Sequence, residues 1–88
     1  MSALVTPGNL RSALAVSRSL GRAGVAVTVA DEHRHSLAGA SRYCRDAVRV
    51  PSPAQSPDSF LHAIQREVER GNHRVLIPTD DIALSLIS

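Results

Sequence analysis

Apolar residues gather in four short runs along the chain, each bounded by polar or turn-forming residues. The runs cover residues 3–5, 25–30, 48–50 and 74–78, and each has the length of a β-strand. The second run is apolar and β-branched enough to be buried on both faces, which is typical of a strand in a parallel sheet. We therefore predict four strands, the second of them fully buried.

The segments between and after these runs change to helical spacing. A first helix begins at Leu10 and stops at Gly24, the better placed of two glycines. A short helix would cover residues 35–41, although Gly39 is unfavourable inside a helix. A third helix covers 57–71, with a proline at its first position and an apolar stripe along one side. A fourth helix opens at Asp80 or Asp81, shortly before the chain ends.

The resulting order, β-α-β-α-β-α-β-α, predicts an α/β fold with a four-stranded parallel sheet and helices on both faces. Right-handed crossovers favour the strand order 3-2-1-4, which is a Rossmann-like half-fold. Residues 1–88 then form a single domain. The last helix ends at Ser88 without a cap or polar closure, so we expect the natural protein to continue beyond it.

Composition narrows the class of protein further. The aromatic residues are Tyr43 and Phe60 alone, so the core is aliphatic, and the formal net charge of +2 comes entirely from arginine against Asp and Glu. No stretch is densely basic, which argues against a nucleic-acid-binding protein. One cysteine, Cys44, excludes an internal disulfide. With no signal peptide and no run long enough to span a membrane, we expect a cytoplasmic domain.

Ligands of open parallel sheets bind beyond the carboxyl ends of the strands, where the strand order reverses. In this topology that point lies between the first and fourth strands. It selects the segments Thr6-Pro7-Gly8-Asn9 and Pro78-Thr79-Asp80-Asp81. The amides that open the first helix could receive an anion.

Three other chemistries are weaker interpretations. Dinucleotide binding needs several glycines at fixed offsets, but Gly8 stands alone, so Asp31 after the second strand is better explained by a cap or a solvated turn than by a ribose. His33, His35 and Cys44 lack the paired spacing of known zinc sites, and we expect no metal ligands. The neighbouring arginines could lower the pKa of Cys44, yet a half-buried structural cysteine is favoured.

Several segments together resemble the N-terminal domain that precedes the ATP-grasp module in ATP-grasp ligases, of the carbamoyl-phosphate synthase large chain and carboxylate–amine ligase type. The resemblance covers nearly all of the chain in the order of that family. Its most specific elements are Ser41-Arg42-Tyr43, the loop Val48-Arg49-Val50-Pro51-Ser52-Pro53 and the strand Val75-Leu76-Ile77-Pro78-Thr79-Asp80. The chain departs from the family at Pro7, where a second glycine is frequent, and at Asp81-Ile82, where an acidic pair often follows.

The resemblance implies that the whole protein uses ATP and Mg²⁺ to activate a carboxylate and couple it to an amine. The nucleotide and metal sites would then lie in a downstream ATP-grasp domain of the same chain, and the 88 residues alone would be inactive. By the family pattern this domain would line one side of the substrate pocket, and the positions that match its loops are Gly8, Asn9, Thr79 and Asp80. Asp80 would then either orient a substrate amine or cap the last helix, and capping is the interpretation we favour. Two alternatives stay open: a dinucleotide-binding half of an oxidoreductase, and a non-catalytic module that forms a homodimer through its open sheet edge or its truncated apolar end.

Overall fold

Four parallel strands form the centre of the molecule. The computed structural model describes residues 2–8, 11–33 and 36–87. The strands are β1 (Ser2–Thr6), β2 (Ala26–Asp31), β3 (Cys44–Arg49) and β4 (Val75–Pro78), in the order β3-β2-β1-β4. All three strand pairings are parallel. The α/β class and the strand order 3-2-1-4 predicted from the sequence are therefore confirmed.

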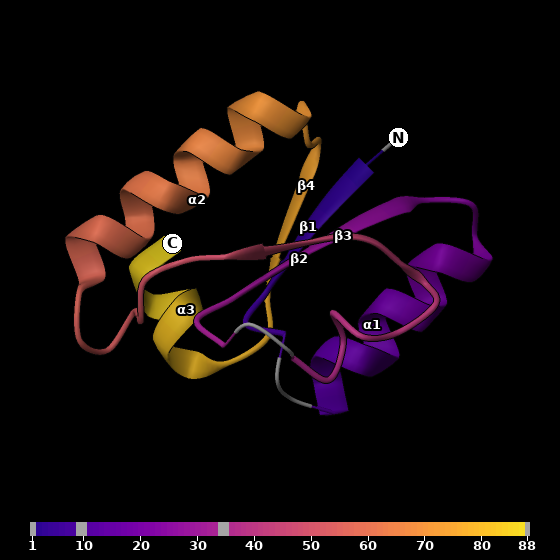
Figure 1. The fold of residues 1–88 in the computed structure, drawn as a ribbon, viewed down its shortest axis with the longest axis horizontal. Coiled ribbons are helices and arrows are strands. Elements are labelled where there is room, and N and C mark those ends of the chain that lie inside the picture. The colour runs from indigo at the N-terminus through magenta and orange to yellow at the C-terminus, as the bar shows by residue number, and fades with distance from the viewer. Residues whose placement is uncertain (1, 9–10, 34–35, 88) are drawn as a thin grey trace.

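The three helices of the described residues lie on both faces of this sheet (Figure 1). α1 (Arg11–Arg22) packs on one face, where Val5 and Val29 meet Ala13. α2 (Pro57–Gly71) and α3 (Asp81–Ile87) pack on the other face, where Leu4 meets Phe60. Alternating side chains of β1 thus enter two separate cores.

The carboxyl ends of α1 and α2 are each closed by a residue with a left-handed backbone conformation. Gly24 has a φ of +83°, and the amides of Gly24 and Val25 donate to the carbonyls of Gly21 and Leu20. This is the Schellman arrangement, which favours glycine at the left-handed position. The stop predicted at Gly24 is thereby confirmed. Asn72, with a φ of 51°, closes α2 in the same way.

The helix predicted over residues 35–41 is wrong for its described part. Residues 36–41 form turns, held by hydrogen bonds such as that from the Ala40 amide to the Ser36 carbonyl, 3.0 Å long. The Ser36 hydroxyl also accepts from the Gly39 amide, and such local bonds compete with helix formation. The β2–β3 connection is therefore a looped crossover. His35 lies outside the described residues.

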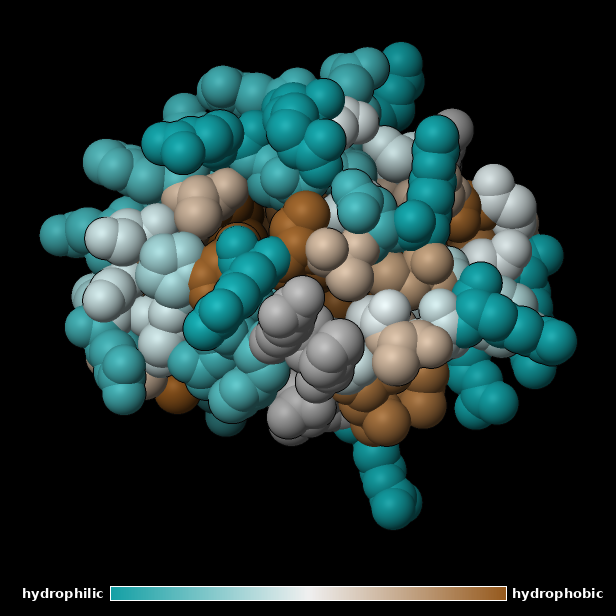
Figure 2. Space-filling view, viewed as in Figure 1, coloured by the Kyte–Doolittle hydropathy of each residue, from teal (hydrophilic) through white to brown (hydrophobic). Residues whose placement is uncertain are grey.

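The outer side of α2 carries exposed charged residues, and hydrophilic side chains cover this helix in the space-filling view (Figure 2). On the opposite side of α2, Phe60 and Ile64 are buried against the sheet. The helix therefore has the amphipathic pattern predicted for it. Among the described residues, no helix combines the length and apolar character needed to cross a membrane.

Candidate functional site

A cavity of about 230 Å³ opens at the carboxyl edge of the sheet. Each strand supplies part of its lining from its carboxyl end or the residues that follow: Thr6 for β1, Asp31 for β2, Val50 for β3 and Asp80 for β4. Phe60 of α2 also lines it. The strand order reverses beside β1, so the cavity lies at the position where open parallel sheets bind ligands.

Asp31 joins two of the loops beside this cavity. The side chain is buried, with 3% of the residue exposed. Its Oδ2 accepts from the Gly8 amide at 2.8 Å, and its Oδ1 accepts from the His33 amide at 2.8 Å. Asp31 is thus neither a solvated turn residue nor a helix cap, the two interpretations that the sequence favoured. It fastens the loop after β1 to the turn after β2.

Gly8 occupies a position with no room for a side chain. A Cβ there would lie 2.3 Å from Cγ1 of Val29 and 2.6 Å from Oγ of Ser36. The Gly8 carbonyl accepts from the Ala38 amide at 2.8 Å, so both backbone groups of Gly8 are hydrogen-bonded within the chain. Glycine therefore allows the loop after β1 to pack closely on β2 and the following turn.

Thr79 and Asp80 lie beside the loop after β1, as the sequence predicted. The Thr79 hydroxyl donates to the Pro7 carbonyl at 2.7 Å, and the Thr79 amide donates to the Thr6 carbonyl at 2.8 Å. Asp80 caps α3, because its Oδ1 accepts from the Ala83 amide at 2.8 Å. The capping role is therefore observed, and Asp80 lines the cavity as well.

The four predicted substrate-binding residues thus have different positions. Asp80 lines the cavity, whereas Gly8 and Thr79 hold together the loops around it. Asn9 and Leu10 lie outside the described residues, so of the amides expected to open the first helix only that of Arg11 is described.

Thr6 lines the cavity and belongs to a segment that the sequence selected, but it is not among the four predicted substrate-binding residues. It is fully buried, and its Oγ1 has no hydrogen-bond partner among the described residues. Side chains alternate along a strand, so Thr6 shares the face of β1 on which Leu4 packs toward Phe60. Extending the alternation of the first apolar run by one residue would have placed Thr6 on this face.

The lining of the cavity contains both acidic and apolar residues. Asp31, Glu32 and Asp80 carry three carboxylates, and His33 lies 3.6 Å from Glu32. Val50, Phe60, Ile82 and prolines supply the apolar lining, and no arginine is among the described lining residues. A lining of this kind favours a ligand with hydrogen-bond donors or positive charge over an anion.

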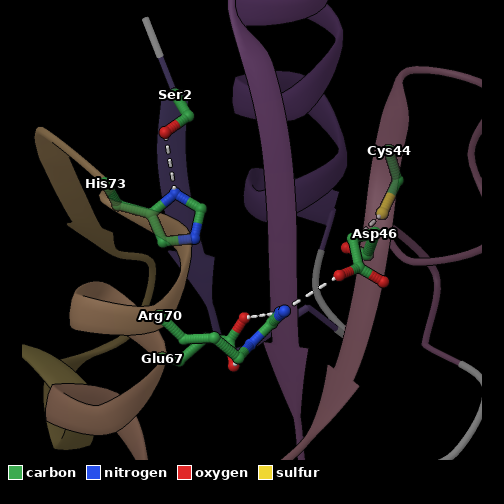
Figure 3. A network of polar contacts seen from close by, with 6 residues as sticks. All are labelled: Ser2, Cys44, Asp46, Glu67, Arg70 and His73. Atoms are coloured by element: carbon green, nitrogen blue, oxygen red, sulfur yellow. Dashed lines mark hydrogen bonds and ion pairs between the residues drawn. The ribbon is translucent and has the colours of Figure 1, made fainter.

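A second polar region lies at the opposite edge of the sheet (Figure 3). Arg70 of α2 binds both Glu67 and Asp46; its Nη2 is 3.2 Å from Oδ2 of Asp46 on β3. The carboxylates raise the pKa of Arg70, Glu67 above all. The pair with Asp46 connects α2 to the outer strand, whereas the pair with Glu67 lies within the helix.

Cys44 belongs to this second region and is half-buried. Its Sγ donates to the Asp46 carbonyl at 3.0 Å, and burial raises the pKa of the thiol. The possibility that the neighbouring arginines lower the pKa of Cys44 is therefore wrong. The favoured interpretation, a half-buried structural cysteine, agrees with the structure. Within residues 2–8, 11–33 and 36–87, no three His, Cys, Asp or Glu side chains form a group that could hold a metal ion.

Tyr43 lies between two arginines. Its hydroxyl accepts from Nε of Arg22 at 3.5 Å and from Nη2 of Arg42 at 3.0 Å. These hydrogen bonds, with that of Arg22 the larger cause, lower the pKa of Tyr43 from 10.0 to about 8. The ring packs against Gly21, where a Cβ would lie 2.7 Å from Cδ1 of Tyr43.

We predict that Tyr43 titrates with a pKa of about 8 in the folded chain. Because the chain has one tyrosine and no tryptophan, near-ultraviolet absorbance of tyrosinate reports this residue alone. Arg22→Gln should move the pKa toward 10.0, whereas Arg18→Gln, an exposed arginine on the same helix, should leave it unchanged.

The lowered pKa also has a defined effect on stability. Folding favours the ionised phenol, so this contribution is fully present above the unfolded pKa near 10.0 and is lost as the pH falls through about 8. A wild-type titration centred near 10.0 would contradict the arrangement of Tyr43 between its arginines.

The fold and the cavity define a small α/β domain of Rossmann-like topology with a candidate small-molecule site at its strand ends. Searches of protein families, curated proteins and solved structures found no match to the chain.

Proposed function

We propose that the chain is the substrate-side domain of a cytoplasmic ATP-grasp ligase, which activates a carboxylate with ATP and Mg²⁺ and couples it to an amine. The observation that carries the proposal is the cavity at the carboxyl edge of a sheet with the order β3-β2-β1-β4. Substrate binding at this edge is the general behaviour of such sheets. Two of the segments that resemble the family, 48–53 and 75–80, lead directly into the cavity lining.

The described residues do not favour ATP or Mg²⁺ at this cavity. Its lining carries three carboxylates, which would repel a triphosphate, and its described part contains no glycine. Among the described residues, no three His, Cys, Asp or Glu side chains form a group that could hold a metal ion. We therefore assign nucleotide and metal binding to a downstream domain. The role of this chain is to hold a small substrate beside that domain and to shield it from water on one side.

Three residues, Asp31, Gly8 and Thr79, support this role by holding the loops around the cavity in place. Their hydrogen bonds join the loops after β1, β2 and β4, which form much of the cavity rim. Asp80 is fixed by its bond to the Ala83 amide, so its carboxylate is held at the cavity without losing side-chain freedom on binding. A preorganised rim of this kind suits a substrate-binding surface.

The proposal is tested with the longest native polypeptide that carries this sequence. We expect ADP release that requires Mg²⁺, a carboxylate and an amine together, and no ADP release from residues 1–88 alone. The competing oxidoreductase would instead bind NAD tightly and lose that binding on Asp31→Ala. NAD-dependent hydride transfer, or no ADP release with a broad panel of carboxylates and amines, would overturn the proposal.

A further inference from the structure

We propose that the cavity at the carboxyl edge selects its ligand through a primary ammonium group, and so takes the amine rather than the carboxylate. The inference starts from the unpartnered hydroxyl of Thr6, which is fully buried and lines the cavity. A buried hydroxyl without a partner is unfavourable, and native chains keep few of them. A hydroxyl both donates and accepts, so a donor or an acceptor on a bound ligand would give it a partner.

The charge of the lining favours a donor over an acceptor as this partner. Asp80 follows Thr79, whose amide binds the Thr6 carbonyl, so the carboxylate of Asp80 and the side chain of Thr6 belong to adjoining strand ends. One oxygen of Asp80 accepts from the Ala83 amide. The remaining oxygen can accept from a cationic donor, and Glu32 adds a second acidic side chain to the lining. A carboxylate or phosphate ligand would meet repulsion at the same place.

The size and apolar residues of the cavity restrict the rest of the ligand. A volume of about 230 Å³ is smaller than the roughly 300–1,000 Å³ of sites for drug-sized molecules. Val50, Phe60 and Ile82 add apolar contacts to the same lining. The ligand class is therefore a compact aliphatic amine whose ammonium group donates to Asp80 and Thr6. Its role as the ligase acceptor rests on the proposed function, but its binding does not.

The binding test uses the 88-residue chain and four probes that share an aliphatic chain but differ in the head group: butylamine, butyrate, butanol and butyltrimethylammonium. Amide chemical shifts of labelled protein are followed as each probe is added. Butylamine should shift the amides around Thr6, His33 and Asp80 in a saturable way. Butyrate and butanol should bind at least roughly tenfold more weakly than butylamine. Butyltrimethylammonium should also bind at least roughly tenfold more weakly, because it carries the charge but has no N–H donors.

Two variants with a matched control locate the site. Asp80→Asn keeps a good N-cap but removes the charge, and should weaken butylamine binding roughly tenfold. Asp81→Asn makes the same charge change at the next residue, which does not line the cavity, and should leave binding unchanged. Thr6→Val keeps the shape of the side chain, so it should fold, and should weaken binding several-fold.

The possible outcomes separate this inference from the proposed function. Equal or tighter binding of butyrate, or butylamine binding that Asp80→Asn and Thr6→Val leave intact, would overturn the ammonium site. Binding that follows the expected pattern while the native polypeptide releases no ADP would support the site and reject the ligase. If the native polypeptide releases ADP and Asp80→Asn leaves the KM for the amine unchanged, the ligase is supported and the ammonium site is rejected.

Discussion

Replacing Phe60 with alanine should lower the free energy of unfolding by about 3–5 kcal/mol, the range typical of large-to-small changes in a core. Phe60 is 1% exposed and is the largest of the fully buried side chains among the described residues. It packs with Leu4, Ile64 and Ala83, and so joins α2 and α3 to the sheet. Small domains have total stabilities of about 5–15 kcal/mol, so the variant should lie close to unfolding at room temperature.

Urea denaturation followed by far-ultraviolet circular dichroism measures this loss as a lower midpoint at an unchanged slope. His62→Ala, an exposed position on the same helix, is the control and should change stability by no more than about 0.5 kcal/mol. Phe60→Leu should fall between the two, because it keeps most of the apolar volume. If Phe60→Ala cost less than Phe60→Leu, the ring would not fill the core as described.

The fold could be predicted largely because its apolar runs are short and buried. β2 is buried from Val27 through Asp31, and its run of β-branched residues is readable without knowing its neighbours. β3 was harder to delimit, since Cys44, Arg45 and Asp46 precede the apolar alternation and lie at the outer edge of the sheet. A strand that is mostly exposed leaves little hydrophobic signal, so the prediction began only at Val48.

The candidate site was only partly predictable, because strand ends can be located from sequence but contacts between them cannot. Thr79 and Asp80 follow a strand and so were placed at the correct edge. The bond between Asp31 and the Gly8 amide joins residues 23 positions apart, and depends on how two neighbouring strands are aligned. The missing partner of Thr6 likewise depends on packing that no local pattern records.

Asp31→Ala should lower the free energy of unfolding by about 2–4 kcal/mol, because it removes the acceptors of two backbone amides beside the cavity. The Gly8 amide is buried and would be left without its partner, while the His33 amide lies nearer to solvent. Asp31→Asn, with the same shape, keeps one oxygen acceptor but turns an NH₂ group toward the other amide. We therefore expect Asp31→Asn to lower the free energy of unfolding by less than Asp31→Ala does.

Hydrogen exchange locates the effect as well as measuring it. In Asp31→Ala the amides of Gly8 and of the 36–41 turn, which the Gly8 carbonyl helps to hold, should exchange faster than those of α2. Glu32→Ala is the matched control, since it removes a neighbouring exposed carboxylate whose described contact is with His33, and it should change stability by no more than about 0.5 kcal/mol. If Asp31→Ala kept full stability but abolished ligand binding, Asp31 would be a ligand contact. The joining of the two loops at the cavity would then have to come from other residues.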